Sequence, residues 1–204
     1  MKLSSLAINS DALVWLPEYG MGYHTAPAIS YDEDYFDNYL SLDASEMGSR
    51  LNHARVNLVE NYWNGEVVDI GVGAGRFVKE KGCFGFDVND KAVNWLKRES
   101  LFCDPYVEPV DCITCWDSLE HIPEPEKLIA QVKCLVFVSM PIYKDADDVL
   151  QSKHYKPGEH LWYWTHEGLQ RWFHSLGFAY VMHNKMETDI GREGIKTYVF
   201  KRVR

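Results

Sequence analysis

The sequence predicts an α/β fold around a mostly parallel sheet, because apolar strands and amphipathic helices alternate along most of the chain. Four short apolar runs contain too few polar positions for an exposed antiparallel sheet. Helical patterns separate these runs, as the crossover connections of parallel strands require. The last two apolar runs have no helical pattern between them, which predicts an antiparallel pair near the C-terminus.

The elements are expected in the following order. A helix with apolar residues at helical spacing covers 45–62, and the Asn64-Gly65 pair ends it. Buried strands are expected at 67–70, 84–88, 112–116 and 135–140. Helices are expected at 75–81, 90–98 and 123–133, and from Thr165 to a stop at Gly177. The antiparallel pair is expected at 178–183 and 196–201.

The first part of the chain is aromatic and acidic. Tyr31, Tyr35 and Tyr39 recur at four-residue spacing, so they would share one face of a helix. This helix either packs on the core or acts as a lid whose tyrosines contact a ligand. We therefore divide the chain into an N-terminal helical and aromatic cap segment, 1–64, and a core domain, 65–204.

Composition limits the function classes. The chain has 204 residues, of which 46% are hydrophobic, enough for one compact domain with a substantial core. A net charge of −9 argues against a broad nucleic-acid-binding surface. No apolar run is long enough to span a bilayer, and Pro17 interrupts the early apolar patch, so we expect a cytoplasmic protein without a secretory signal.

The five cysteines are expected to be reduced thiols in apolar strands. Cys112 and Cys115 form a Cys-x-x-Cys motif, but a second pair at zinc-site spacing is missing. Five of the histidines also lack a metal-ligand spacing: His24, His53, His166, His174 and His183. We therefore expect no metal site.

The run 67–77, Val-Val-Asp-Ile-Gly-Val-Gly-Ala-Gly-Arg-Phe, is a strand followed by glycines at alternate positions. Such a loop lets the backbone approach a ligand closely beside the positive end of the next helix. By itself it fits two cofactors, S-adenosylmethionine and a nicotinamide dinucleotide. The dinucleotide fingerprint G-x-G-x-x-G places its third glycine where this chain has Arg76, which favours S-adenosylmethionine.

Acidic side chains occur at the expected carboxyl ends of the strands, where open α/β sheets bind ligands. Asp69, Asp87 and the Trp116-Asp117 pair occupy such positions. A carboxylate that accepts both ribose hydroxyls makes charge-assisted hydrogen bonds of about 1.5–3 kcal/mol each. Asp87 is the residue placed for this role.

Further motifs follow the glycine loop in a fixed order: Gly-Phe-Asp87-Val-Asn-Asp, Asp111-Cys-Ile-Thr-Cys-Trp-Asp117-Ser-Leu-Glu-His121-Ile-Pro, Phe-Val-Ser-Met-Pro141, and His160-Leu-Trp-Tyr-Trp-Thr165 before Gly177-Phe178. As a set they resemble the class I S-adenosylmethionine-dependent methyltransferases, in their small-molecule branch, from residue 66 onward. The resemblance implies a Rossmann-like sandwich with a seven-stranded, mostly parallel sheet and an antiparallel last strand. It also implies methyl transfer to an oxygen or nitrogen of a small or medium acceptor.

The resemblance assigns roles in a cofactor site. It implies that Asp69 and the loop backbone at Gly71, Gly73 and Gly75 surround the methionine part of S-adenosylmethionine. Asp87 would bind the ribose, and Val88 would pack against adenine. The remaining assignments are Trp116 and Asp117 beside the cofactor and Asp104 at the adenine amino group. The stretch before Asp111 is shorter than the family usually shows.

The acceptor side is less defined. His121 is the best-placed histidine for a proton-accepting base, and the alternative is a structural histidine that holds its loop. His160 and Tyr163 would line an acceptor pocket that Tyr31 and Tyr35 close, unless these aromatic residues only pack.

Two other functions remain open. One is a non-catalytic S-adenosylmethionine-binding regulatory or assembly protein. The other is a nucleic-acid methyltransferase. The acidic net charge argues against it, and so does the absence of the Asn/Asp-Pro-Pro-Tyr/Phe/Trp motif of amino-methylating DNA enzymes, because Asp104-Pro105-Tyr106 lacks the second proline.

Overall fold

A computed structural model describes residues 12–24 and 45–203. Its strands are β1 (Leu13–Leu16), β2 (Met21–His24), β3 (Val68–Ile70), β4 (Phe84–Phe86), β5 (Val110–Trp116), β6 (Val132–Tyr143), β7 (Trp162–Thr165), β8 (Phe178–Asn184) and β9 (Ile195–Arg202). Its helices are α2 (Glu46–Tyr62), α3 (Arg76–Lys81), α4 (Asp90–Arg98), α5 (Pro125–Ala130), α6 (Ala146–Gln151), α7 (His166–Ser175), α8 (Met186–Ile190) and the 3₁₀ helix η1 (Leu119–His121). The helix expected around Tyr31 and Tyr35 lies outside the described residues.

The centre of the sheet is parallel, in the order β4-β3-β5-β6. β9 runs antiparallel to β6 and also pairs with β8, so Phe200 lies opposite both Val136 and Tyr180. A single parallel bridge joins Gly85 to Phe102 at the outer edge of β4. This arrangement confirms the Rossmann-like methyltransferase fold with an antiparallel last strand.

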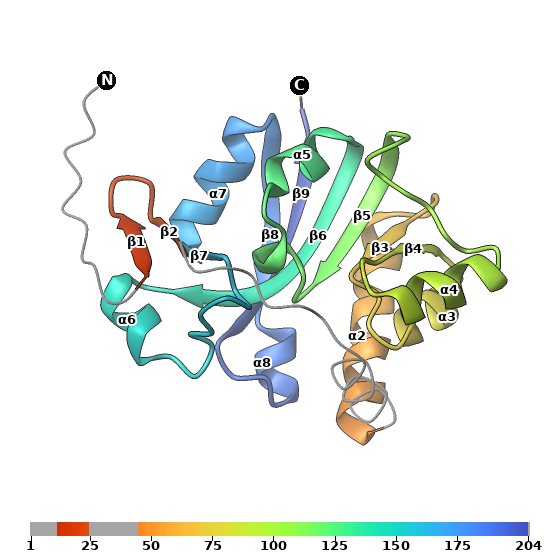
Figure 1. The fold of residues 1–204 in the computed structure, drawn as a ribbon, viewed down its shortest axis with the longest axis horizontal. Helices are drawn as coiled ribbons and strands as arrows, with labels where there is room; N and C mark the ends of the chain where they lie inside the picture. The colour runs from red at the N-terminus through yellow and green to blue at the C-terminus, as the bar shows by residue number, and fades with distance from the viewer. Residues whose placement is uncertain (1–11, 25–44, 204) are drawn as a thin grey trace.

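The sheet extends beyond the expected seven strands. The end of β6 pairs with β7, and β7 pairs with the β1–β2 hairpin, which gives nine strands in the described residues. Figure 1 shows this extension with α6 on one side of the molecule and α3 and α4 on the other. The described part of the N-terminal segment therefore contains a hairpin as well as the expected helix α2. The hairpin strands span only four residues each, too short for a clear sequence signal.

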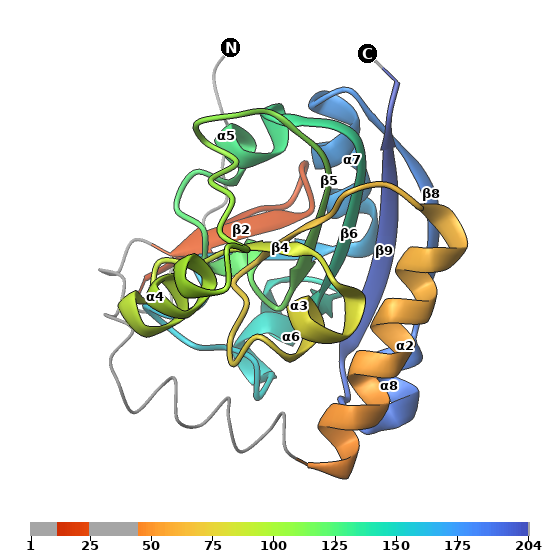
Figure 2. The ribbon, with the colours of Figure 1, turned by 90° about the vertical axis from the view of Figure 1, so that its right-hand side faces the viewer.

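Helices cover both faces of the sheet (Figures 1 and 2). α5 and α7 pack on one face, where Leu128 and Phe173 join the core. α2, α3 and α4 pack on the other, with Val59, Val78 and Leu96 fully buried. A third cluster of buried apolar side chains packs the β1–β2 hairpin against β6, β7 and α6. In the described part of the chain, no helix combines the length and apolar character needed to cross a membrane.

Candidate functional site

The glycine loop connects β3 to α3 at the carboxyl edge of the parallel strands. Gly71, Gly73 and Gly75 have φ angles of 75°, 54° and 81°, a region that residues with a side chain rarely adopt. A β-carbon added at Gly71 would lie 2.8 Å from the β-carbon of Ser118. One added at Gly75 would lie 2.4 Å from the Trp95 ring. The glycines thus let the loop lie against both the segment after β5 and helix α4.

Asp69 supports this loop from within the sheet. Its carboxylate is 2% exposed and accepts a hydrogen bond of 2.6 Å from the Thr114 hydroxyl on β5. Because β3 and β5 are neighbours, this bond ties the two strands together directly below the loop. The structure therefore gives Asp69 an internal partner, and its expected contact with a ligand stays a prediction.

Asp87 lies directly after β4 and against the glycine loop. Its Oδ1 accepts the backbone N–H of Asn89 at 2.8 Å. Burial raises the pKa of the Asp87 carboxyl, and backbone hydrogen bonds, including those from Val72 and Gly73 of the loop, oppose this rise. The neighbouring Val88 is 71% exposed. The structure thus brings the expected ribose-binding acid to the loop, with an apolar side chain open beside it.

Four charged residues meet at the carboxyl end of β5. Arg55 from α2 donates to Glu187 at 2.8 Å and to Asp117 at 3.3 Å. Arg192 donates to Glu187 at 2.6 Å and also to Asp117. Burial alone would raise the pKa of Asp117, but Arg192 and Arg55 hold it below its usual value. We call these four residues the charge cluster.

Only Asp117 of the charge cluster was expected from the sequence. The others come from α2, from α8 and from the turn after α8, and no short motif links such distant positions. The Glu187 side chain is 0% exposed, whereas those of Arg55, Asp117 and Arg192 are 16%, 18% and 27% exposed, so the cluster is partly buried around a fully buried acid. It fixes α2 and α8 against the end of β5.

Trp116 lies under the charge cluster. The Arg55 guanidinium stacks 5.1 Å from the centre of its ring, and Phe77 contacts it edge-on at 5.4 Å. With 7% exposure, the ring belongs to the core between α2 and α3. Its expected position beside the cofactor stays a prediction.

His121 and His160 meet beyond the end of β5. Their rings are 4.7 Å apart and nearly perpendicular, at 77°. The two segments that carry them are joined because Leu161 donates to the Glu120 carbonyl at 2.8 Å and Trp162 Nε1 to the Ile122 carbonyl at 2.9 Å. Burial lowers the pKa of both histidines, to about 2 for His160, so both rings are neutral at pH 7.

Tyr163 has a different environment from the one expected. Its side chain is 0% exposed, its hydroxyl donates to the His160 carbonyl at 3.0 Å, and its ring packs against Tyr143 at 5.7 Å. It is thus a core residue that attaches the β1–β2 hairpin to the sheet. The hairpin, which the sequence analysis missed, is the reason for this burial.

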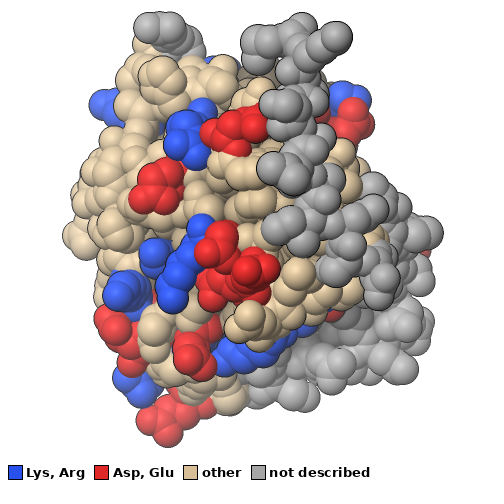
Figure 3. Space-filling view, turned by 90° about the vertical axis from the view of Figure 1, so that its left-hand side faces the viewer, with Lys and Arg blue, Asp and Glu red and all other residues tan. Residues whose placement is uncertain are grey.

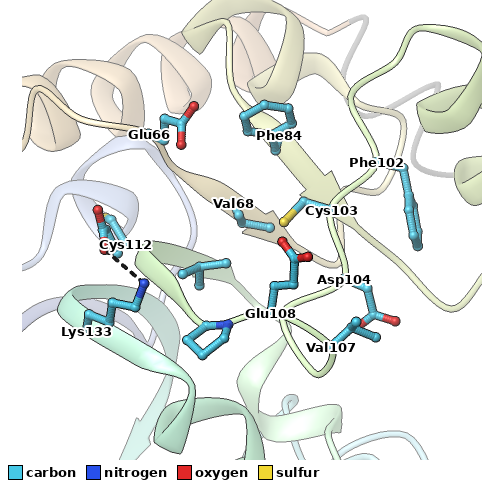
Figure 4. A pocket seen from close by; sticks show the side chains of 13 residues that line it. Glu66, Val68, Phe84, Phe102, Cys103, Asp104, Val107, Glu108, Cys112 and Lys133 are labelled. Carbon is cyan, nitrogen blue, oxygen red and sulfur yellow. Dashed lines mark ion pairs between the residues drawn. The ribbon is translucent and has the colours of Figure 1, made fainter.

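Asp104 follows the Gly85–Phe102 bridge at the outer edge of β4. Its Oδ1 accepts the Tyr106 N–H at 2.9 Å, and its side chain lines a cavity of about 620 Å³ (Figure 4). Glu66 and Asp111, which line the same cavity, precede β3 or begin β5. The cavity therefore reaches the amino ends of these strands, at the edge of the sheet opposite the glycine loop. It is not the proposed cofactor-binding site. The expected contact of Asp104 with adenine stays a prediction.

The Cys-x-x-Cys pair does not converge on one site. Cys112 and Cys115 are both fully buried, but they belong to the cores on opposite faces of the sheet. Burial raises the pKa of both thiols, which keeps them protonated at neutral pH. They are core residues, as expected.

Comparisons with known proteins agree with this geometry. The family model described as "Methyltransferase domain" matches residues 31–183. Magnesium protoporphyrin IX methyltransferase from Synechocystis PCC 6803, crystallised with bound S-adenosylhomocysteine, is 12% identical and superposes with a TM-score of 0.59, over 85% of this chain and 96% of that chain. A protein from Thermotoga maritima described as a possible histamine N-methyltransferase is 12% identical, with a TM-score of 0.59 over 84% and 97%.

A small RNA methyltransferase also shares the fold, at 16% identity and a TM-score of 0.52, over 77% of this chain and 25% of that chain. A search of curated proteins found no match. The structural likenesses establish the fold, and the family model covers most of the chain. The chain therefore belongs to the methyltransferase domain family and is a class I enzyme that uses S-adenosylmethionine as its methyl donor.

Proposed function

We propose that this methyltransferase acts on an oxygen or nitrogen of a small or medium acceptor. The observation that carries the proposal is the pair of neutral histidines, partly buried His121 and buried His160, which meet beyond the end of β5. The names of two similar structures, those for magnesium protoporphyrin IX and histamine, support a small acceptor.

The charges support the same class of acceptor. The net charge is −9, and the face in Figure 3 has acidic and basic side chains side by side rather than a continuous basic patch. Nucleic-acid binding depends on clustered Lys and Arg that neutralise phosphates. A nucleic-acid acceptor is therefore the less favoured alternative.

The glycine loop lies at the carboxyl edge of the parallel strands, which is where an open α/β sheet binds its cofactor. In our proposal the backbone of Gly71 and Gly73 holds the methionine part, Asp87 binds the ribose hydroxyls and Val88 contacts adenine. The bound cofactor supplies a methyl group on a positively charged sulfur. The protein's task is to hold the acceptor in line with that methyl and to exclude water.

His121 is the proposed proton acceptor. A base must have an unprotonated nitrogen, and burial lowers the pKa of His121, which keeps the ring neutral. Asp117 would stabilise the imidazolium after proton transfer, since its carboxylate acts electrostatically on this ring. His160 contacts the His121 ring and would help to orient it.

Gly71→Ala is expected to weaken S-adenosylhomocysteine binding at least about 10-fold. The new methyl would press on Ser118, and the φ of 75° costs about 1–2 kcal/mol for a residue with a side chain. Isothermal titration calorimetry measures the change. The double variant Gly71→Ala/Ser118→Gly should regain part of the loss, because the contact is relieved while the backbone strain remains. Equal affinity of Gly71→Ala and wild type would refute this view of the loop.

Transfer of an isotope-labelled methyl group tests the function. The protein is incubated with labelled S-adenosylmethionine and a panel of phenols, carboxylates and amines, in parallel with RNA and DNA oligonucleotides. We expect label in a small molecule. Label found only in nucleic acid would contradict the proposed acceptor class. Cofactor binding without turnover on any acceptor would favour a non-catalytic binding protein.

A further inference from the structure

Three side chains near the proposed acceptor side form a group with the chemistry of a metal site. Glu120, His121 and His160 each offer a ligand atom, and these atoms lie within 4.8 Å of one another. A point at their centre is at most about 2.8 Å from each, so shifts of less than about 1 Å would give metal–ligand distances of 2.0–2.2 Å. We propose that these residues bind one divalent first-row transition-metal ion.

Glu120 provides the strongest argument for a bound cation. The residue is 1% exposed, and within residues 12–24 and 45–203 neither of its carboxylate oxygens has a hydrogen-bond partner on another residue, although its own backbone N–H acts on the carboxylate. A buried carboxylate without a partner is costly, and buried charges are normally paired or bound to metals. Burial and the nearby charge of Asp117 both raise the pKa of Glu120. A cation at this point would neutralise the carboxylate and use both of its oxygens.

The charged groups around Glu120 do not neutralise its carboxylate. Arg192 faces Glu120 at longer range, but Asp117 and Glu187 act on Glu120 with the opposite sign. Arg192 is already bound to these two acids. The nearest ring, His121, has its Nε2 4.0 Å from Glu120 Oε1 and is neutral. Among the residues that the structure describes, no side-chain cation therefore forms an ion pair with this carboxylate.

The two histidines have the protonation state and the backbone contacts that metal ligands need. A metal requires a neutral imidazole, and burial lowers the pKa of both rings. His121 interacts with the backbone of Glu159, and His160 with the backbone of His154. Metal-bound histidines typically make this kind of second contact, because it fixes the tautomer and the ring orientation.

The scaffold that carries the three ligands is held together without the metal. The Glu120 carbonyl accepts the Leu161 N–H at 2.8 Å, so the backbone after His160 is attached directly to the residue that supplies the carboxylate. The Trp162 indole then binds the Ile122 carbonyl. The ligands thus come from η1 and from the residue before β7, which explains why sequence spacing gave no sign of a metal.

The donor set indicates which ions would bind. Two imidazole nitrogens and one carboxylate oxygen suit Zn²⁺, Mn²⁺, Fe²⁺ or Co²⁺, whereas Mg²⁺ and Ca²⁺ prefer oxygen ligands. Three protein ligands leave at least one coordination position for water or another oxygen donor. In the metal-bound protein His121 is a ligand, so its role as a base applies only to the metal-free form.

Metal titration of the full-length chain tests the site. The protein is stripped with a chelator, dialysed, and titrated with Zn²⁺ by calorimetry and with Co²⁺ by visible absorption. We expect one equivalent of each ion and a Co²⁺ spectrum with nitrogen and oxygen ligands. Zn²⁺ at about 100 times its Kd should raise the Tm by about 5–10 °C.

His160→Ala and Glu120→Gln should weaken Zn²⁺ binding more than about 100-fold, since changes outside the ligand set already cost about 10–100-fold. His174→Ala, an exposed histidine on α7, is the control and should bind Zn²⁺ like wild type. Wild-type protein that takes up less than one equivalent, or His160→Ala that binds Zn²⁺ as tightly as wild type, would overturn the proposal. S-adenosylhomocysteine binding is measured in every sample. Wild-type protein that binds S-adenosylhomocysteine but no metal would reject the metal site alone and leave the proposed function standing.

Discussion

Asp87→Ala is expected to weaken S-adenosylhomocysteine binding at least about 100-fold. The carboxylate lies after β4 against the glycine loop, where two ribose hydroxyls would donate to it. Two charge-assisted hydrogen bonds at the lower value of about 1.5 kcal/mol each give about 3 kcal/mol, or about two powers of ten in Kd. Calorimetric titration of the variant and wild type measures the ratio.

Asp90→Ala is the matched control for this prediction. Asp90 is an exposed acid three residues further on, in the first turn of α4. Its loss removes the same charge from the same region, and we expect less than about a 3-fold change in affinity, as for an exposed charge. Similar losses in both variants would show that Asp87 acts only through net charge. An unchanged affinity in Asp87→Ala would exclude it from the ribose site.

Glu187→Gln is expected to lower the free energy of unfolding by about 3–5 kcal/mol, the usual cost of removing one partner from a buried ion pair. Glu187 is fully buried and accepts from both Arg55 and Arg192. Without its charge, two partly buried guanidinium groups share only Asp117. Urea unfolding followed by circular dichroism measures the change, and the Tm should fall by at least about 6 °C.

Glu193→Gln is the control that distinguishes the effect of removing a buried charge from the effect of removing any ion pair. Glu193 also forms an ion pair, with Lys153 at 3.2 Å, but its side chain is 85% exposed. Such a surface pair contributes at most about 1 kcal/mol, so this variant should unfold almost as wild type does. If both variants lose the same small amount, the charge cluster does not hold α2 and α8 in place.

The parallel half of the fold was predictable because its signals are local. Buried strands, helix caps and alternate glycines each occur within about ten residues, and β3, β5, α2 and α7 formed where these patterns occur. The β1–β2 hairpin was not predictable in this way. Its four-residue strands are stabilised by pairing with β7, more than 130 residues later in the chain.

The candidate site also has residues that local sequence predicts and residues that only distant contacts bring together. Asp87 and the glycines could be placed from strand ends, because the carboxyl ends of parallel strands meet at one edge. Arg55, Glu187 and Arg192 carry no motif, and only the packing of α2 and α8 against β5 brings them to Asp117. Tyr163 was expected in a pocket because it belongs to a run of aromatic residues. The hairpin that covers it has no local sequence signal.

Titration of the wild-type chain tests most directly whether the glycine loop and Asp87 form an S-adenosylmethionine site. Calorimetry is carried out with S-adenosylhomocysteine and, on the same preparation, with NAD. We expect one site per chain for S-adenosylhomocysteine and no measurable heat from NAD. Binding of NAD with no binding of S-adenosylhomocysteine would contradict this assignment.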